Sequence, residues 1–142
     1  MEVTEITEYK QDFVDVLQRL LPQLSQSAAP PSTELTRQII ESDSSRLLIA
    51  QEKDVVLGML TIVIFPIPSG IRAWIEDVVV DETGRGKGVG EALNQHALQL
   101  ARDEGARTID LTSRPSREAA NRLYQRIGFV PRETNIYRYN VD

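Results

Sequence analysis

The sequence predicts an α/β fold in which a mixed β-sheet is flanked by helices. Apolar runs rich in β-branched residues alternate along the chain with segments of helical periodicity. At residues 78–91, a β-branched run, a polar turn, alternating glycines and a helix-forming stretch follow one another directly. The chain has 142 residues, of which 41% are apolar, so it can bury an ordinary core. We therefore expect a single domain over residues 1–142.

Two helices and a loop are predicted before the first core strand. Residues 12–21 carry apolar side chains at helical spacing, and Pro22 is expected to end that helix. Residues 23–31 are rich in Ser, Ala and Pro and predict a loop. Residues 33–41 predict a second, shorter helix.

The middle of the chain predicts three strands. Residues 47–51 and 55–65 form the first two, joined by a tight turn at Lys53–Asp54. Residues 66–70 contain proline and glycine and predict a break. Residues 72–81 are then the central strand of the sheet.

The last third alternates between helix and strand. Gly105 and Gly128 each follow a helical stretch, where a C-terminal glycine is favoured. The predicted elements are a helix at 89–102, a strand at 108–112, a helix at 116–127, and strands at 129–132 and 136–141. From residue 47 onward the predicted order is therefore β-β-β-α-β-α-β-β.

Three alternating glycines between the central strand and the helix after it indicate an anion site. The first N–H groups of a helix are unpaired, and Gly86, Gly88 and Gly90 let a phosphate approach the backbone closely. The P-loop pattern does not fit, because Gly88 follows Lys87 and Asp81 stands where the first glycine belongs. The dinucleotide pattern G-x-G-x-x-G also lacks its third glycine. The remaining spacing suggests a bound pyrophosphate.

Two motifs together resemble a known family. Arg85-x-x-Gly88-x-Gly90 resembles the acetyl-coenzyme A loop of the GCN5-related N-acetyltransferase (GNAT) family, written Q/R-x-x-G-x-G/A. About thirty residues later, Asn121 and Tyr124 on one helix face, followed by a Gly-Phe pair, are similar to the second signature of that family. The resemblance covers roughly residues 47–139. It does not identify the acceptor.

The resemblance implies a GNAT-type fold and an N-acetyltransferase domain that uses acetyl-coenzyme A as co-substrate. The pyrophosphate would lie on the backbone of residues 86–90, with Arg85 and Lys87 adding positive charge. The pantetheine arm would pair like an extra strand with the backbone of residues 78–80. The residues expected to bind the donor are Val78, Val79, Val80, Arg85, Gly86, Lys87, Gly88, Val89, Gly90, Glu91 and Asn121.

Acetyl transfer to a primary amine by direct attack needs a base, because an alkyl ammonium has a pKa near 10.4. Glu76 and Asp77 stand at the central strand, and strand alternation sends them to opposite faces unless a bulge intervenes. We prefer Glu76, since Ile-Glu-Asp-Val resembles the acceptor segment of glucosamine-phosphate and polyamine acetyltransferases. Trp74, Glu76 and Asp77 are the candidate acceptor-binding residues. The histone-type branch of the family has its base glutamate at the position of Trp74, so the substrate of that branch is disfavoured here. The alternative for Glu76 and Asp77 is a charge pair at the strand edge with no catalytic role.

Tyr124 is the candidate acid that protonates the leaving thiolate. The alternative is a core aromatic residue with a satisfied hydroxyl. Tyr137 and Tyr139 share a strand face and could line the acceptor pocket or a homodimer contact.

Composition narrows the function classes. The chain has no cysteine and a single histidine, His96, so no metal site is expected. A net charge of −5 and a pI near 5.0 argue against nucleic-acid binding and suit a cationic acceptor. No apolar run reaches the roughly 20 residues of a membrane span, and the N-terminus is acidic, so we expect a cytoplasmic protein.

Three function classes stay open. The first class, which we favour, is an N-acetyltransferase that uses acetyl-coenzyme A. Its favoured acceptor is a small cationic amine or an amino sugar, and the alternative acceptor is a peptide or protein amine. The second class is a non-catalytic module that binds acetyl-coenzyme A. The third class is an unrelated nucleotide-binding protein, which the failed phosphate motifs disfavour.

Overall fold

The computed structural model describes residues 1–141. Contacts between residues divide the chain into two compact units, Met1–Thr112 and the part that begins at Ser113. Each unit is described by itself.

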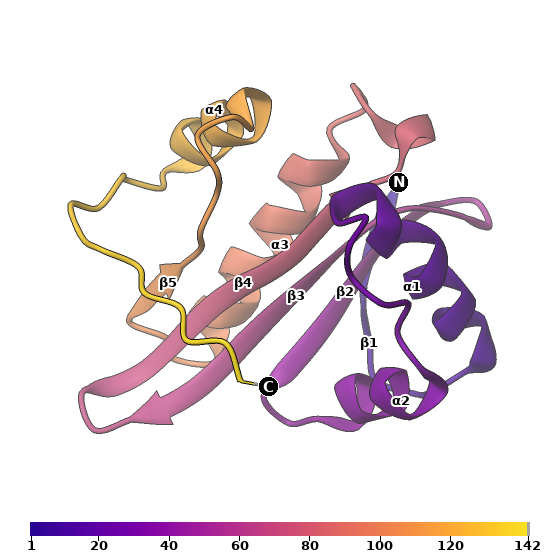
Figure 1. Cartoon of the computed structure of the whole chain (residues 1–142), viewed down its shortest axis with the longest axis horizontal. Helices are drawn as coiled ribbons and strands as arrows, with labels where there is room; N and C mark the ends of the chain where they lie inside the picture. The colour runs from indigo at the N-terminus through magenta and orange to yellow at the C-terminus, as the bar shows by residue number, and fades with distance from the viewer. Residues whose placement is uncertain (142) are drawn as a thin grey trace. The chain divides into compact units, whose positions relative to one another are not determined.

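The first unit contains a five-stranded sheet in the order β1-β2-β3-β4-β5 (Figure 1). The strands are β1 (Glu2–Ile6), β2 (Ser45–Glu52), β3 (Val55–Ile67), β4 (Gly70–Val80) and β5 (Thr108–Asp110). The first four run antiparallel to their neighbours, and β5 runs parallel to β4. The mixed sheet confirms the predicted fold class. Strand β1 was missed by the sequence analysis because it is a short edge strand with little apolar alternation.

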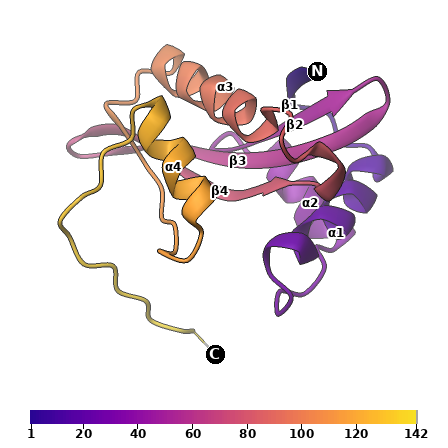
Figure 2. The same ribbon diagram turned by 90° about the horizontal axis from the view of Figure 1, so that it is seen from above.

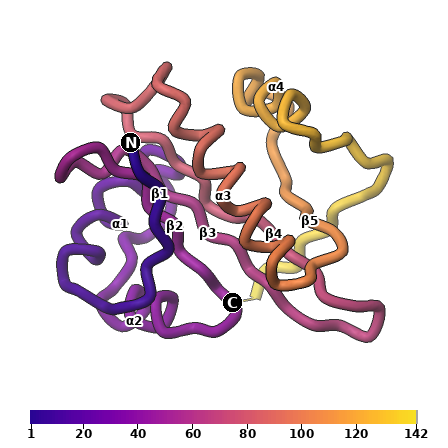
Figure 3. Tube along the Cα trace, turned by 180° about the vertical axis from the view of Figure 1, so that it is seen from behind, coloured from indigo at the N-terminus to yellow at the C-terminus, as the bar shows by residue number. Residues whose placement is uncertain are grey.

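Helices cover both faces of this sheet. Helices α1 (Gln11–Leu24) and α2 (Thr33–Glu41) lie on one face, and α3 (Val89–Asp103) lies on the other (Figure 2). Helix α3 connects β4 to its parallel neighbour β5, which requires a crossover over one face of the sheet. The view from behind shows this crossover along β2, β3 and β4 (Figure 3). Among residues 1–141, no helix is long and apolar enough to cross a membrane.

The two faces are filled differently. On the α1 and α2 face, one cluster of buried apolar residues consists of Leu17, Leu20, Ile40, Leu47, Ile49, Met59 and Val79. On the α3 face, Gly58 allows close packing, since a Cβ there would lie 2.9 Å from Val89 Cγ1 and 2.8 Å from a backbone oxygen. The carboxyl end of β4 is thus held between α1 and α3.

Helix α1 is longer than predicted, because Pro22 lies inside it and does not end it. A proline loses one helical hydrogen bond, since it has no N–H. The turn beyond Pro22 still closes, because the N–H of Ser25 donates to the carbonyl of Leu21 at 3.0 Å. Tertiary contacts of this turn, described below, stabilise it further.

Strand β3 also continues past its predicted end. It runs through Pro66 to Ile67, so the predicted break over 66–70 shrinks to a two-residue turn. In a hairpin with Ile67 opposite Gly70, the next pair outward is Pro66 opposite Ile71, which is a non-hydrogen-bonded pair. A proline is tolerated there because no N–H is needed for the ladder. The tight turn at residues 53–54 is confirmed, with φ of 57° at Lys53.

The second unit contains helix α4 (Glu118–Ile127), which ends at Gly128 with φ of 117°. The predicted strands at 129–132 and 136–141 are wrong: residues 129–141 form no strand (Figure 1). A strand requires a hydrogen-bonded neighbour, and these residues make no backbone ladder. Their apolar pattern is real but leaves large side chains in solvent, namely Val130, Ile136, Tyr137, Tyr139 and Val141.

Candidate functional site

The loop between β4 and α3, residues 82–88, presents an open backbone; we call it the glycine loop. It begins with a 3₁₀ turn, η1 (Glu82–Gly84). Gly86 and Gly88 have φ of 78° and 77°, in the left-handed region that favours glycine. A Cβ at either position would meet nothing within 4 Å. The space beside these two glycines is therefore free for a ligand to approach the backbone.

Four backbone N–H groups of the glycine loop and the first turn of α3 have no backbone acceptor among the described residues. Within residues 1–141, no backbone carbonyl accepts from the N–H groups of Gly86, Gly88, Val89 and Gly90. The helical ladder begins one residue beyond Glu91, where the N–H of Ala92 donates to the Gly88 carbonyl at 3.0 Å. Unpaired N–H groups at a helix N-terminus attract an anion, and the helix dipole adds to this attraction.

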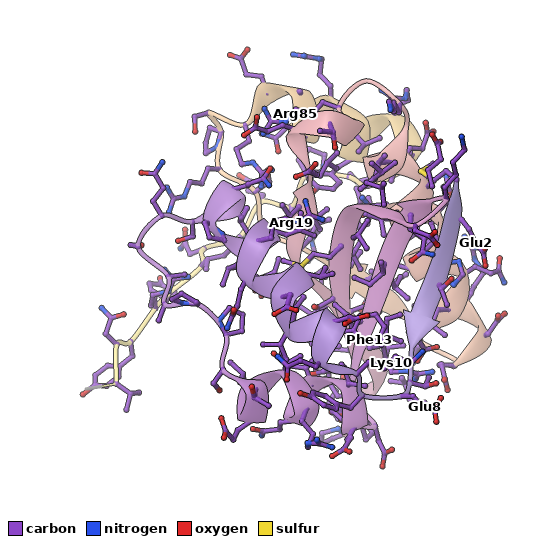
Figure 4. All side chains as sticks on the ribbon, turned by 90° about the vertical axis from the view of Figure 1, so that its right-hand side faces the viewer. Glu2, Glu8, Lys10, Phe13, Arg19 and Arg85 are labelled. Carbon is purple, nitrogen blue, oxygen red and sulfur yellow. The ribbon has the colours of Figure 1, made fainter. Side chains whose placement is uncertain are left out.

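Two cations flank the same backbone. Arg85 and Lys87 are exposed side chains of the glycine loop. Arg85 is labelled in Figure 4, where it projects from the loop beyond the end of the sheet. Their charges complement an anion bound to the loop.

Strand β4 has a free backbone edge beside the glycine loop. It pairs with β5 only at Arg72, Ala73 and Trp74. Within the described residues, no strand pairs with residues 75–80 on that side. An amide-containing ligand can therefore add to this edge as an extended strand, and the backbone of Val78, Val79 and Val80 lies within it.

A β-bulge interrupts β4 at Asp77. Thr61 lies opposite Glu76 and Met59 opposite Val79, so the two residues between them on β4 face a single residue of β3. Asp77 has φ of 49°, an uncommon conformation that aspartate tolerates better than most residues. Simple alternation therefore does not decide the faces of Glu76 and Asp77, because the bulge that the sequence analysis allowed for is present. Both carboxylates are exposed.

Trp74 and Glu76 form a pair on one face of β4. The indole Nε1 of Trp74 donates a hydrogen bond of 2.7 Å to Oε1 of Glu76. Glu76 lies opposite Thr61, two residues along β3 from the core residue Met59, which places the pair on the α1 and α2 face. The indole thus fixes one carboxylate oxygen and leaves the other free to accept a proton or bind a cation.

Asp81, at the end of β4, carries a network that the sequence analysis did not find. The residue is 6% exposed, and Oδ1 accepts from Nε2 of Gln23 at 2.7 Å and from an Arg19 guanidinium N–H at 3.0 Å. Its Oδ2 accepts from the N–H and the hydroxyl of Thr83. Gln23 also accepts from the N–H of Glu82 at 3.2 Å. No local pattern signals this network, because its partners lie about sixty residues apart.

These contacts hold the pKa of Asp81 below its ordinary value of 3.8; the hydrogen bond from Gln23 is the largest cause. A lowered pKa stabilises the fold above the ordinary pKa, and this contribution is lost as pH falls through the lowered value. We expect the wild type to be more stable than Asp81→Asn at pH 6, with the difference shrinking below about pH 4. Urea unfolding of both proteins between pH 6 and pH 2 measures this, and a pH-independent difference would contradict it.

Asn94 is a second polar residue that pattern reading passed over. It is fully buried in α3, and Nδ2 donates to the Gly90 carbonyl at 2.8 Å, while Oδ1 has no partner among the described residues. A buried unsatisfied oxygen is unfavourable. The sequence could have predicted that Asn94 is buried, because it adjoins the apolar stripe of the helix that contains Leu93 and Ala97.

In the second unit, Tyr124 is 7% exposed and packs edge-on against Phe129 at a centroid distance of 5.8 Å. Within residues 1–141 no protein group forms a side-chain hydrogen bond with its hydroxyl, and that hydroxyl is not among the buried unsatisfied atoms. The choice between a catalytic acid and a core aromatic residue stays a prediction. Burial raises the pKa of Tyr124, and Arg117 opposes that effect. Asn121 uses its side-chain N–H₂ locally, donating to the Arg114 carbonyl at 3.0 Å.

A family model matches the sequence over most of the chain. The model describes the acetyltransferase (GNAT) family and matches residues 11–129. The chain belongs to the GNAT family. This finding confirms the resemblance seen in the glycine loop and in the signature around Tyr124. The match runs through both compact units.

Two curated relatives carry N-acetyltransferase names. N-alpha-acetyltransferase 30 of Schizosaccharomyces pombe is 33% identical over 69 residues, which are 49% of this chain and 45% of the relative. An uncharacterised N-acetyltransferase of Methanocaldococcus jannaschii is 34% identical over 61 residues, 43% of this chain and 27% of the relative. The chain therefore matches less than half the length of each.

Solved structures share the whole fold. A putative acetyltransferase of Agrobacterium tumefaciens has a TM-score of 0.86 at 20% identity, covering 99% of this chain and 100% of that one. An integron cassette protein of Vibrio cholerae has a TM-score of 0.79 at 26% identity, covering 99% and 93%. The GNAT-type fold is thereby confirmed. Among residues 1–141, no cluster of three or more His, Cys, Asp or Glu side chains could hold a metal ion.

Proposed function

We propose that this protein is an acetyl-coenzyme A-dependent N-acetyltransferase that acts on a primary amine. The observation that carries the proposal is the run of unpaired N–H groups around Gly86 and Gly88, in a chain of the GNAT family. Because the family match crosses both compact units, we propose that residues 1–142 act as one acetyltransferase domain.

The donor fits the chain's own groups. The N–H groups of residues 86, 88, 89 and 90 would hold the pyrophosphate, and Arg85 and Lys87 would add charge. The free edge of β4 at residues 78–80 would pair with the amides of the pantetheine arm. Donor contacts of Glu91, in the first turn of α3, and of Asn121 stay expectations from the resemblance. When bound, acetyl-coenzyme A supplies an acetyl group activated as a thioester.

The acceptor would meet Trp74, Glu76 and Asp77. An aromatic ring beside a carboxylate suits an alkyl ammonium, through cation–π attraction and charge. The net charge of −5 favours a cationic acceptor in the same sense, so a small amine or amino sugar is the preferred class. A peptide amine is the second candidate, favoured by the sequence similarity to N-alpha-acetyltransferase 30.

Two side chains would move protons. Glu76, with one oxygen fixed by Trp74, would take a proton from the ammonium directly or through water. Tyr124, which is protonated at neutral pH like an ordinary tyrosine and whose pKa burial raises further, would give a proton to the leaving thiolate. No nucleophilic side chain is required, since the amine attacks the thioester directly.

The test is incubation with acetyl-coenzyme A and a panel of polyamines, amino sugars and peptides, with free thiol measured against a reaction without amine. We expect amine-dependent thiol release. Binding of acetyl-coenzyme A without turnover on any amine would favour the non-catalytic module. Absence of binding would contradict the donor assignment.

Glu76→Gln tests the base. We expect the rate to fall roughly ten- to hundredfold at pH 7 and to recover partly at alkaline pH, where free amine is abundant. Asp77→Asn is the matched control, because asparagine tolerates the same backbone conformation and the change removes the neighbouring charge. The measurement is a pH–rate profile of each variant. If Asp77→Asn loses activity and Glu76→Gln keeps the wild-type profile, the base is Asp77.

A further inference from the structure

We propose that Arg19 and Gln23 of α1, together with Asp81, form a clamp that positions the glycine loop for the donor. These three residues are called the α1 clamp below. The proposal rests on the proposed function, in which the glycine loop binds the pyrophosphate of acetyl-coenzyme A. The proposal gives α1 a positioning role, although α1 lies outside the glycine loop.

The clamp is built from complementary groups. Gln23 uses both ends of its amide: Nε2 donates to Asp81 at 2.7 Å and Oε1 accepts from the N–H of Glu82 at 3.2 Å. Arg19 donates to Asp81 at 3.0 Å and, with its other terminal nitrogen, to the Val56 carbonyl at 3.1 Å. Arg19 is labelled in Figure 4, on α1 beside the sheet. The clamp therefore ties α1 to β3 and to the end of β4.

Asp81 transmits these contacts into the loop. Its Oδ2 caps η1 by accepting from Thr83, and its carbonyl accepts from the N–H of Gly84 at 2.8 Å. Gly84 is the second anchor, because a Cβ there would lie 3.1 Å from Leu57. From residue 85 to residue 88, every side chain or glycine is exposed. Because residues 85–88 are exposed, the contacts of η1 are the ones that can fix the direction of the N–H groups that follow it.

The extension of α1 past Pro22 has a reason in this clamp. A helix ending at Leu21 would leave Gln23 outside the helix, and proline disfavours the extra turn. The two hydrogen bonds of Gln23 offset that cost and place its amide opposite Asp81. The last turn of α1 therefore carries the residue that contacts Asp81 and Glu82. A separate segment, residues 25–32, then connects α1 to α2.

Gln18 provides a matched control. It lies on the same helix, is the same residue type, and donates one side-chain hydrogen bond of 2.9 Å to the Pro31 carbonyl. Within the part of the chain that the structure describes, its side chain forms no hydrogen bond with the glycine loop. Gln18→Ala should therefore show the effect of removing a glutamine side chain from α1 without the effect on the loop.

The experiment measures two properties of the full chain for wild type, Gln23→Ala, Gln23→Glu and Gln18→Ala. The first is amide hydrogen exchange of residues 82–91 in the free protein. The second is the Kd of acetyl-coenzyme A by calorimetry, and melting temperatures verify folding. We expect Gln23→Ala to speed loop exchange and to weaken binding, each by about fivefold or more. Gln23→Glu should do at least as much, since it sets a carboxylate against Asp81. Gln18→Ala should match the wild type in both.

The outcomes separate the clamp from the donor assignment. Unchanged exchange and unchanged affinity in both Gln23 variants overturn the clamp and leave the proposed function standing. Faster exchange with unchanged affinity also overturns it, because a merely structural contact would do the same. Equal effects of Gln18→Ala and Gln23→Ala overturn it as well. A wild type that does not bind acetyl-coenzyme A overturns the proposed function itself and, with it, the positioning role for the donor.

Discussion

Gly88→Val is expected to weaken acetyl-coenzyme A binding on the order of tenfold to a hundredfold while the protein stays folded. Gly88 has φ of 77°, where a β-branched residue is strained by about 1–3 kcal/mol. A Cβ at this position meets no protein atom within 4 Å, so the valine side chain would stand in the space that the donor needs. Calorimetry with acetyl-coenzyme A measures the effect.

Gly105→Val is the matched control for strain. Gly105 lies just beyond the other end of α3 with φ of 85°, and a Cβ there meets only a side-chain carbon of Ile71 at 3.8 Å. The two variants should lose similar stability, which unfolding in urea measures. Only Gly88→Val should lose donor affinity. If both bind acetyl-coenzyme A like the wild type, the pyrophosphate lies elsewhere.

The sequence predicted the parts of this site that depend on local pattern. The glycine loop, the helix after it and the signature around Tyr124 each lie within at most 15 residues, where spacing alone carries the information. Helix α2 was predicted with its observed bounds, and α3 differs by one residue at its end. The preference for Glu76 over Asp77 stays a prediction.

What the sequence could not predict depends on long-range contacts. The bulge at Asp77 exists because β3 and β4 pair in a particular register, which neither strand encodes alone. The last turn of α1 depends on Asp81, whose position relative to Gln23 follows from the whole sheet. The strands predicted over 129–141 are wrong, because a local apolar alternation forms a strand only where a hydrogen-bonded neighbour lies beside it.

The second large effect is expected from Tyr124→Phe. The change removes only the hydroxyl, and the phenyl ring keeps its edge-on contact with Phe129. Since that hydroxyl has no hydrogen-bond partner among the described residues, its loss should cost little stability. We expect kcat to fall at least about tenfold, or roughly 1.4 kcal/mol in the barrier, with the Kd of acetyl-coenzyme A within about twofold of wild type.

The pH dependence gives this prediction a second readout. Burial raises the pKa of Tyr124, so the protonated acid persists above the ordinary pKa of 10.0, and activity that needs the acid should decline only beyond that value. Tyr124→Phe should lose this alkaline decline. Tyr137→Phe is the control, because that hydroxyl lies on an exposed side chain of the same unit and accepts from Asn135. If Tyr124→Phe turns over like the wild type when chemistry limits the rate, Tyr124 serves packing and the thiolate leaves without a protein acid.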